Sequence, residues 1–117
     1  MLFAGDDHSI VDALGRDAPS MAIDVVGYAR SAGEARALAA DLSPDVVLLD
    51  LEAPAMGGTA AIGLLKAQPG FPIVFVLSSE DTLFARTQSF AAGADGFVTK
   101  TEPGKLRALL AKVRPYL

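Results

Sequence analysis

The chain has 117 residues, of which 51% are hydrophobic, so it suits one folded domain with a buried core and not a disordered segment. It contains no cysteine, which excludes disulfide scaffolds, zinc–thiolate sites and cysteine nucleophiles and favours a reducing, cytoplasmic location. The net charge is −4 with no basic stripe, so we expect no direct nucleic-acid binding by this chain. No apolar run is long enough to cross a bilayer, and we expect no membrane association.

Short apolar runs alternate with helical patterns along the chain. The runs end near residues 5, 28, 50, 77 and 99. Three of them, Ile23 to Ala29, Val46 to Leu49 and Ile73 to Leu77, are rich in β-branched residues and apolar on both faces. This pattern is typical of strands in a parallel sheet that is covered on both sides.

The helical segments between the runs carry start and stop signals. Ser31 and Glu34 have the spacing of a capping box, and Pro44 is expected to end the helix that follows them. Asp81 is the expected N-cap of a later helix. Pro103 is expected at the start of the last one.

Five strands alternating with five helices predict a single α/β domain over residues 1–117, with a doubly wound parallel sheet. Ligands bind such sheets outside the carboxyl ends of the strands. The polar residues expected at those ends are Asp6, Asp7, Asp50, Ser78 and Lys100. Each alone has an ordinary explanation as a polar residue leaving a strand, but their joint placement predicts one site.

The residue types at this edge indicate phosphoryl chemistry. Three carboxylates at close range repel one another, and Mg²⁺ is the natural partner because it prefers oxygen ligands. Lys100 and Ser78 would add a positive charge and a hydroxyl donor for a phosphoryl group, while Asp50 would be the nucleophile.

These features resemble the receiver domain of two-component response regulators. The resemblance covers nearly the whole chain and is carried by Asp6-Asp7-His8, the run from Pro44 to Leu51, Pro54 with Gly58, Ser78, and the run from Gly93 to Lys100. The Asp-Asp-His start and the sequence after the lysine are similar to the LuxR/NarL-type branch. Ala53 and Gly57 depart from the family, which often has a methionine and an acid at these two positions.

The resemblance implies a flavodoxin-like, or CheY-like, sheet with the strand order 2-1-3-4-5 and five helices. It implies that a sensor histidine kinase donates a phosphoryl group to Asp50. It also implies that Mg²⁺ is held by Asp6 or Asp7, by Asp50, and by the backbone carbonyl of Glu52. Such a protein catalyses only its own phosphorylation and dephosphorylation.

The resemblance also implies roles for the residues around the nucleophile. Ser78 and Lys100 would coordinate phosphoryl oxygens, and Ser78 with Phe97 would form the switch that alters the face of the fourth helix, fifth strand and fifth helix. The sequence pattern alone favours Phe97 as a core residue of the last strand, and only the resemblance favours the switch role. We hypothesise that Glu52 and Glu80 set the phosphate lifetime, although plain solvated acids remain an open interpretation.

Two other functions remain open from the sequence. A degenerate receiver would keep the fold as an interaction module without accepting phosphate. An unrelated α/β protein is disfavoured. An aspartyl phosphohydrolase would need a substrate cap, for which no segment is spare, and a flavin binder would need a phosphate-binding loop where Gly5-Asp6-Asp7 offers acids. Members of the resembling branch regulate transcription through a separate DNA-binding domain. Whether this receiver acts alone, with such a domain, or as a homodimer upon phosphorylation is not fixed by the sequence.

Overall fold

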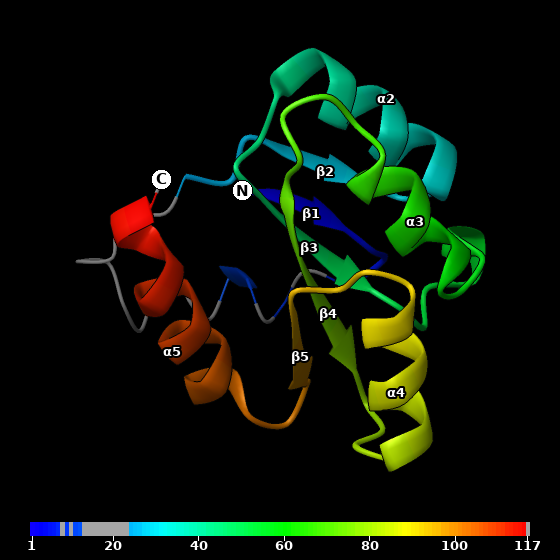
Figure 1. Ribbon diagram of the computed structural model, residues 1–117, viewed down its shortest axis with the longest axis vertical. Coiled ribbons are helices and arrows are strands. Elements are labelled where there is room, and N and C mark those ends of the chain that lie inside the picture. The colour runs from blue at the N-terminus through cyan, green and yellow to red at the C-terminus, as the bar shows by residue number, and fades with distance from the viewer. Residues whose placement is uncertain (8, 10, 13–23, 117) are drawn as a thin grey trace.

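A five-stranded parallel sheet forms the centre of the molecule (Figure 1). The computed structural model describes residues 1–7, 9, 11–12 and 24–116. The strands are β1 (Leu2–Ala4), β2 (Gly27–Ala29), β3 (Val46–Asp50), β4 (Ile73–Ser78) and β5 (Gly96–Thr99). Their order in the sheet is β2-β1-β3-β4-β5, which confirms the predicted order.

Four helices and two short 3-10 turns accompany the described strands. They are α2 (Ala32–Leu42), α3 (Ala60–Lys66), α4 (Leu83–Ala91) and α5 (Pro103–Val113), with the turns at Pro54–Met56 and Arg114–Tyr116. We also predicted a helix after Asp7, the first of five in chain order. Most of that segment, including His8, lies outside the described residues. None of the helices in the described part is long and apolar enough to cross a membrane.

The sheet is covered on both faces, as the apolar runs predicted. Side chains of β3 alternate between two hydrophobic clusters, with Val47 and Leu49 on one face and Val46 and Leu48 on the other. The first cluster is completed by α2 and α3, whereas α5 packs against the second; Figure 1 shows these helices on opposite sides of the sheet. All five residues of β3 are buried, so its carboxyl end is held in a fixed position.

The second strand is shorter than predicted. Of the run from Ile23 to Ala29, only Gly27–Ala29 forms β2, residues 24–26 are irregular, and residue 23 lies outside the described part. β2 is an edge strand that pairs only with the three-residue β1, which limits the length of their ladder. In this edge strand, the residue Tyr28 is 44% exposed.

The start of α2 follows the predicted cap, whereas the start of α4 does not. The Ser31 hydroxyl accepts a hydrogen bond from the Glu34 N–H at 3.1 Å. At α4, the N-cap is Thr82 and not Asp81, because the extended backbone of Thr82 lets its hydroxyl accept from the Ala85 N–H at 3.0 Å. The prediction for Asp81 was therefore wrong by one residue.

The two proline signals are confirmed. α2 ends at Leu42, two residues before Pro44, and Ser43 between them has a left-handed backbone with φ of 47°. α5 begins at Pro103. Both helices therefore end or begin where a proline ring excludes or permits helical backbone.

Candidate functional site

Three of the predicted site residues meet at the carboxyl ends of β3, β4 and β5. Asp50 and Ser78 are the last residues of their strands, and both are 3% exposed. Lys100 follows β5 directly, and its N–H donates to the Ser78 carbonyl at 2.9 Å. The parallel ladder thus places a buried carboxylate, a buried hydroxyl and an ammonium group at one edge of the sheet.

The Asp50 carboxylate has two charge-stabilising contacts. The Lys100 Nζ lies 3.0 Å from Oδ2, and the Glu52 N–H donates to Oδ1 at 3.0 Å. A buried carboxylate without such partners would be strongly disfavoured. These contacts therefore hold both carboxylate oxygens of Asp50 in place.

Glu52 is not a plain solvated acid. Its carboxylate lies 3.1 Å from the Lys100 Nζ and accepts from the Ser79 N–H at 2.7 Å and from the Ser79 hydroxyl. Partial burial raises the pKa of Glu52, but the hydrogen bonds from Ser79 and Lys100 outweigh this and hold the pKa below its usual value. Glu52 thus stays ionised and joins the loop after β3 to the loop after β4.

Lys100 is held between the two acids. Burial lowers the pKa of this lysine, but its hydrogen bonds to Asp50 and Glu52 outweigh burial and raise the pKa above its ordinary value. The ammonium group therefore remains charged across the physiological pH range.

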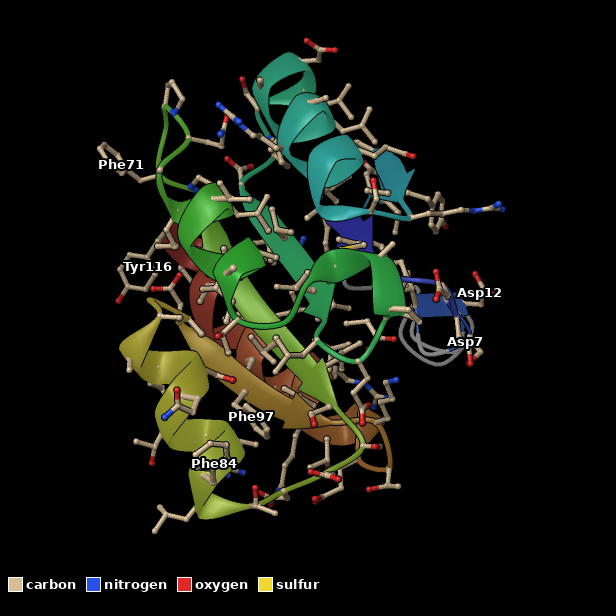
Figure 2. The ribbon with its side chains drawn as sticks, turned by 90° about the vertical axis from the view of Figure 1, so that its right-hand side faces the viewer. Asp7, Asp12, Phe71, Phe84, Phe97 and Tyr116 are labelled. Atoms are coloured by element: carbon tan, nitrogen blue, oxygen red, sulfur yellow. The ribbon has the colours of Figure 1, made fainter. Side chains whose placement is uncertain are left out.

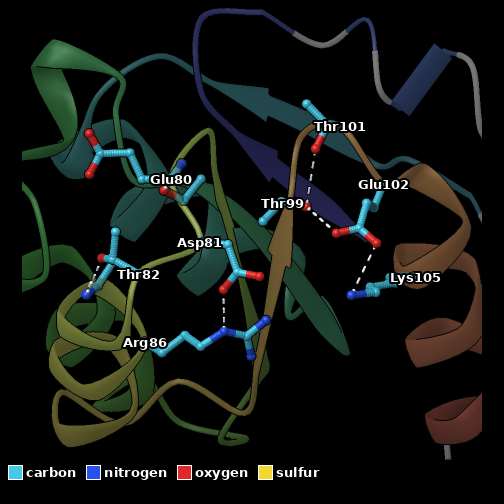
Figure 3. A network of polar contacts seen from close by, with 10 residues as sticks. Glu80, Asp81, Thr82, Arg86, Thr99, Thr101, Glu102 and Lys105 are labelled. Atoms are coloured by element: carbon cyan, nitrogen blue, oxygen red, sulfur yellow. Dashed lines mark hydrogen bonds and ion pairs between the residues drawn. The ribbon is translucent and has the colours of Figure 1, made fainter.

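The loop that carries Lys100 is fixed by a second set of polar contacts (Figure 3). The buried Thr99 donates its hydroxyl hydrogen to Glu102 at 3.1 Å, and Lys105 pairs with the other oxygen of Glu102 at 3.0 Å. These contacts tie the end of β5 to the first turn of α5, on either side of the lysine.

Ser78 and Glu80 are linked through the backbone. The Ser78 hydroxyl accepts from the Glu80 N–H at 3.1 Å. The Glu80 side chain is exposed, and Figure 3 shows it extended away from the pair formed by Asp81 and Arg86. The structure thus gives Glu52, but not Glu80, a side-chain contact in the site.

The predicted switch residue Phe97 is buried, with 6% of its surface exposed. The Arg86 guanidinium lies over its ring, 5.0 Å from the centroid, and is itself paired with Asp81. The sequence did not predict this contact between Arg86 and Phe97, because no local pattern links an arginine on α4 to an aromatic residue on β5.

The acidic pair Asp6 and Asp7 follows β1 at the carboxyl edge of the sheet. Both are exposed, and the Ser9 N–H donates to the Asp7 carboxylate at 3.0 Å. Figure 2 shows Asp7 on the side of the molecule away from Phe84 and Phe97. Across residues 1–7, 9, 11–12 and 24–116, no three His, Cys, Asp or Glu side chains converge closely enough to hold a metal ion.

The donor chemistry nevertheless fits Mg²⁺. The predicted set needs two carboxylates and one backbone carbonyl, which are oxygen ligands of the kind that this ion prefers. The chain also brings the acidic segment next to the nucleophile, because a Cβ atom at Gly5 would lie only 2.7 Å from the Asp50 Cβ. The residues just after Gly5 therefore start beside Asp50.

Comparisons with known proteins agree with this arrangement. The family model of the response regulator receiver domain matches residues 1–114. The response regulator GacA of Pseudomonas aeruginosa is 40% identical over 79 residues, which cover 67% of this chain and 36% of GacA. The transcriptional regulatory protein KdpE of Mycobacterium tuberculosis is 35% identical over 114 residues, which cover 97% of this chain and 49% of KdpE. The chain thus spans between about a third and a half of these relatives.

Solved structures with the same fold include members of this family. A LuxR-family two-component response regulator from Aurantimonas sp. SI85-9A1 has a TM-score of 0.75 and 31% identity, over 95% of this chain and 84% of that one. A CheY-like receiver domain protein from Methanospirillum hungatei JF-1 has a TM-score of 0.76 and 25% identity, over 98% and 90%. With its fold, its strand-end residues and the family match in agreement, the chain belongs to the response regulator receiver domains of two-component systems.

Proposed function

We propose that this receiver accepts a phosphoryl group on Asp50 from the phosphohistidine of a sensor histidine kinase, in the cytoplasm. The observation that supports the proposal best is the state of Asp50, a 3% exposed carboxylate at a strand end with the Lys100 ammonium 3.0 Å away. A carboxylate held by a positive charge at an open strand end is positioned as a nucleophile toward phosphorus.

The proposed reaction is a direct transfer. A carboxylate oxygen of Asp50 attacks phosphorus, the phosphorus–nitrogen bond of the phosphohistidine breaks, and its electron pair leaves with the histidine nitrogen, which takes up a proton. The product is an acyl phosphate on Asp50. Lys100 and Ser78 would stabilise the phosphoryl oxygens through an ammonium group and a hydroxyl group, since this chemistry needs mainly positioning and charge neutralisation.

Mg²⁺ would be held by Asp6 or Asp7, by Asp50, and by the backbone carbonyl of Glu52. When bound, the ion would offset the negative charge that gathers between the carboxylates and the incoming phosphoryl group. The three acids differ in exposure, so the exposed pair is available to solvent cations while Asp50 remains fixed.

Phosphorylation would alter the face formed by α4, β5 and α5. The phosphoryl group adds about two negative charges and several acceptors, which Ser78 and Lys100 can bind. A shift of Ser78 would be transmitted to Phe97, which packs between β5 and α4 under Arg86. A nearly complete switch requires about 5.5 kcal/mol of differential stabilisation. Glu52 and Glu80 would influence how long the phosphate lasts.

The test is intact mass after incubation with acetyl phosphate and Mg²⁺. We expect one phosphoryl adduct in the parent, and none in Asp50→Asn or in the sample with a metal chelator. A folded parent that forms no adduct under any condition would instead be a degenerate receiver that acts only through protein contacts.

A further inference from the structure

Three hydrogen-bond donors converge on the carboxylate of Glu52. They are the Ser79 N–H at 2.7 Å, the Ser79 hydroxyl, and the Lys100 Nζ at 3.1 Å. Two of these donors come from the loop after β4 and the third from the end of β5. A carboxylate that collects a backbone N–H, a hydroxyl and an ammonium group occupies a small anion-binding site built by the chain itself.

This anion-binding site adjoins the nucleophile. The Lys100 ammonium group contacts Asp50 and Glu52 at once, with distances of 3.0 and 3.1 Å to their nearest oxygens. Ser79 immediately follows Ser78, the buried hydroxyl at the end of β4. An anion attached to Asp50 would therefore lie next to donors that Glu52 already holds.

We propose that Glu52, Ser79 and Lys100 form an autoinhibitory latch, in which the Glu52 carboxylate occupies donors that a phosphoryl group on Asp50 would otherwise bind. This inference rests on the proposed function of Asp50. Phosphorylation releases Lys100 and Ser79 from Glu52, and the loop after β4 is then free to follow the new anion. Glu52 thus opposes formation of the acyl phosphate, an effect separate from any influence on its hydrolysis.

The exposure of the latch limits the size of the effect. The side chains of Lys100 and Glu52 are 35% and 36% exposed, so water and salt screen their attraction. Because this screening weakens the attraction, we expect loss of the Glu52 carboxylate to speed phosphorylation only about three- to tenfold.

The experiment compares the parent with Glu52→Ala, Ser79→Ala and the control Glu34→Gln. Initial rates of adduct formation with acetyl phosphate and Mg²⁺ are followed by intact mass, and the Ser79 amide is followed by ¹H–¹⁵N NMR in the unphosphorylated, metal-free protein. Ser79→Ala removes a hydroxyl donor but no charge, so its expected gain of about twofold cannot arise from reduced repulsion. Glu34→Gln removes one negative charge from an exposed acid in the first turn of α2, outside the proposed site, and should leave the rate unchanged.

A latch requires a faster rate in both Glu52→Ala and Ser79→Ala, together with an upfield shift of the Ser79 amide in Glu52→Ala. Faster phosphorylation in Glu52→Ala and Glu34→Gln, with an unchanged rate in Ser79→Ala, would show that the effect is charge repulsion and would overturn the latch. Equal rates in all four proteins would overturn it as well while leaving Asp50 as the phosphoacceptor. If the parent forms no adduct, the proposed function of Asp50 is wrong, and the latch is wrong as well.

Discussion

The two sides of the sheet are built differently. On one side, β3 and β4 are almost wholly buried strands of five and six residues, and they end in Asp50 and Ser78. On the other side, β1 and β2 have three residues each, and the edge residue Tyr28 is 44% exposed. The difference teaches that the nucleophile ends the strand with the longer ladder, since β3 pairs with β4 over five residues and β1 pairs with β2 over three.

The same contrast divides the proposed site. The nucleophile and its hydroxyl neighbour leave strands that are packed on both faces, so their positions are set by the core. The acidic pair Asp6 and Asp7 leaves the shorter side and is exposed. A reacting group benefits from a fixed position, whereas acids that take a cation from solvent must remain accessible.

The largest expected effect tests the contrast in packing directly. Leu48→Ala removes a fully buried side chain from the centre of β3 and should lower the free energy of unfolding by about 2–5 kcal/mol. Val26→Ala, next to the edge strand, removes a side chain that is 49% exposed and should cost about 0.5 kcal/mol or less. Urea unfolding of both variants measures the difference, and similar losses would show that the two sides are equally packed.

A second prediction concerns the close packing between β4 and β5. A Cβ atom at Gly96 would lie 2.8 Å from a ring carbon of Phe75 and 3.1 Å from a methyl carbon of Leu109. Since Phe75 is 1% exposed and cannot move aside, Gly96→Ala should destabilise the protein by about 1–3 kcal/mol.

The partner substitution makes this prediction specific. Adding Phe75→Leu to Gly96→Ala should recover part of the loss, because the smaller side chain leaves room for the new methyl group. A double-mutant cycle by urea unfolding measures the coupling. Strictly additive losses would mean that the ring of Phe75 is not what excludes a side chain at Gly96.

A third, smaller effect is expected at Asp95, in the motif that precedes the lysine. Its carboxylate accepts from the Val74 N–H at 2.9 Å and from the Lys66 Nζ at 2.8 Å, so it fastens the start of β4 to α3. Asp95→Ala should cost about 1–2 kcal/mol because the Val74 N–H loses its partner. Asp41→Ala, an exposed acid on α2, is the matched control for thermal unfolding and should leave Tm nearly unchanged.

The sequence was sufficient for the parts of the fold that depend on local pattern. Buried runs located β3 and β4, and the serine and prolines located ends of α2 and α5, because hydrophobic periodicity and capping act over a few residues. The strand-end rule then placed Asp50, Ser78 and Lys100 at one edge. These three positions follow from topology and needed no knowledge of side-chain contacts.

Contacts between segments that are distant along the chain could not be predicted from the sequence. The bond from Ser79 to Glu52 joins residues 27 positions apart, and the stacking of Arg86 on Phe97 joins α4 to β5. Neither leaves a periodic signal. The error at Asp81 has a different cause, since it and Thr82 are both good capping residues and only the backbone conformation decides between them.

The smallest effect concerns the exposed ion pair between Asp81 and Arg86 of α4. The hydrogen bond from Arg86 lowers the pKa of the Asp81 carboxyl below its ordinary value of 3.8. A depressed pKa in the folded state means that the pair stabilises the protein above the unfolded-state pKa, and that this contribution is lost as the pH falls through the folded-state pKa. Titration of the Asp81 carboxyl carbon by NMR should therefore give a midpoint below 3.8, and Arg86→Gln should move it upward. Because the pair is exposed, added salt should also raise the midpoint while the midpoint of urea unfolding near neutral pH stays almost constant. A large loss of stability in Arg86→Gln would instead mean that the contact of Arg86 with the Phe97 ring contributes to the packed core, which would then include part of α4.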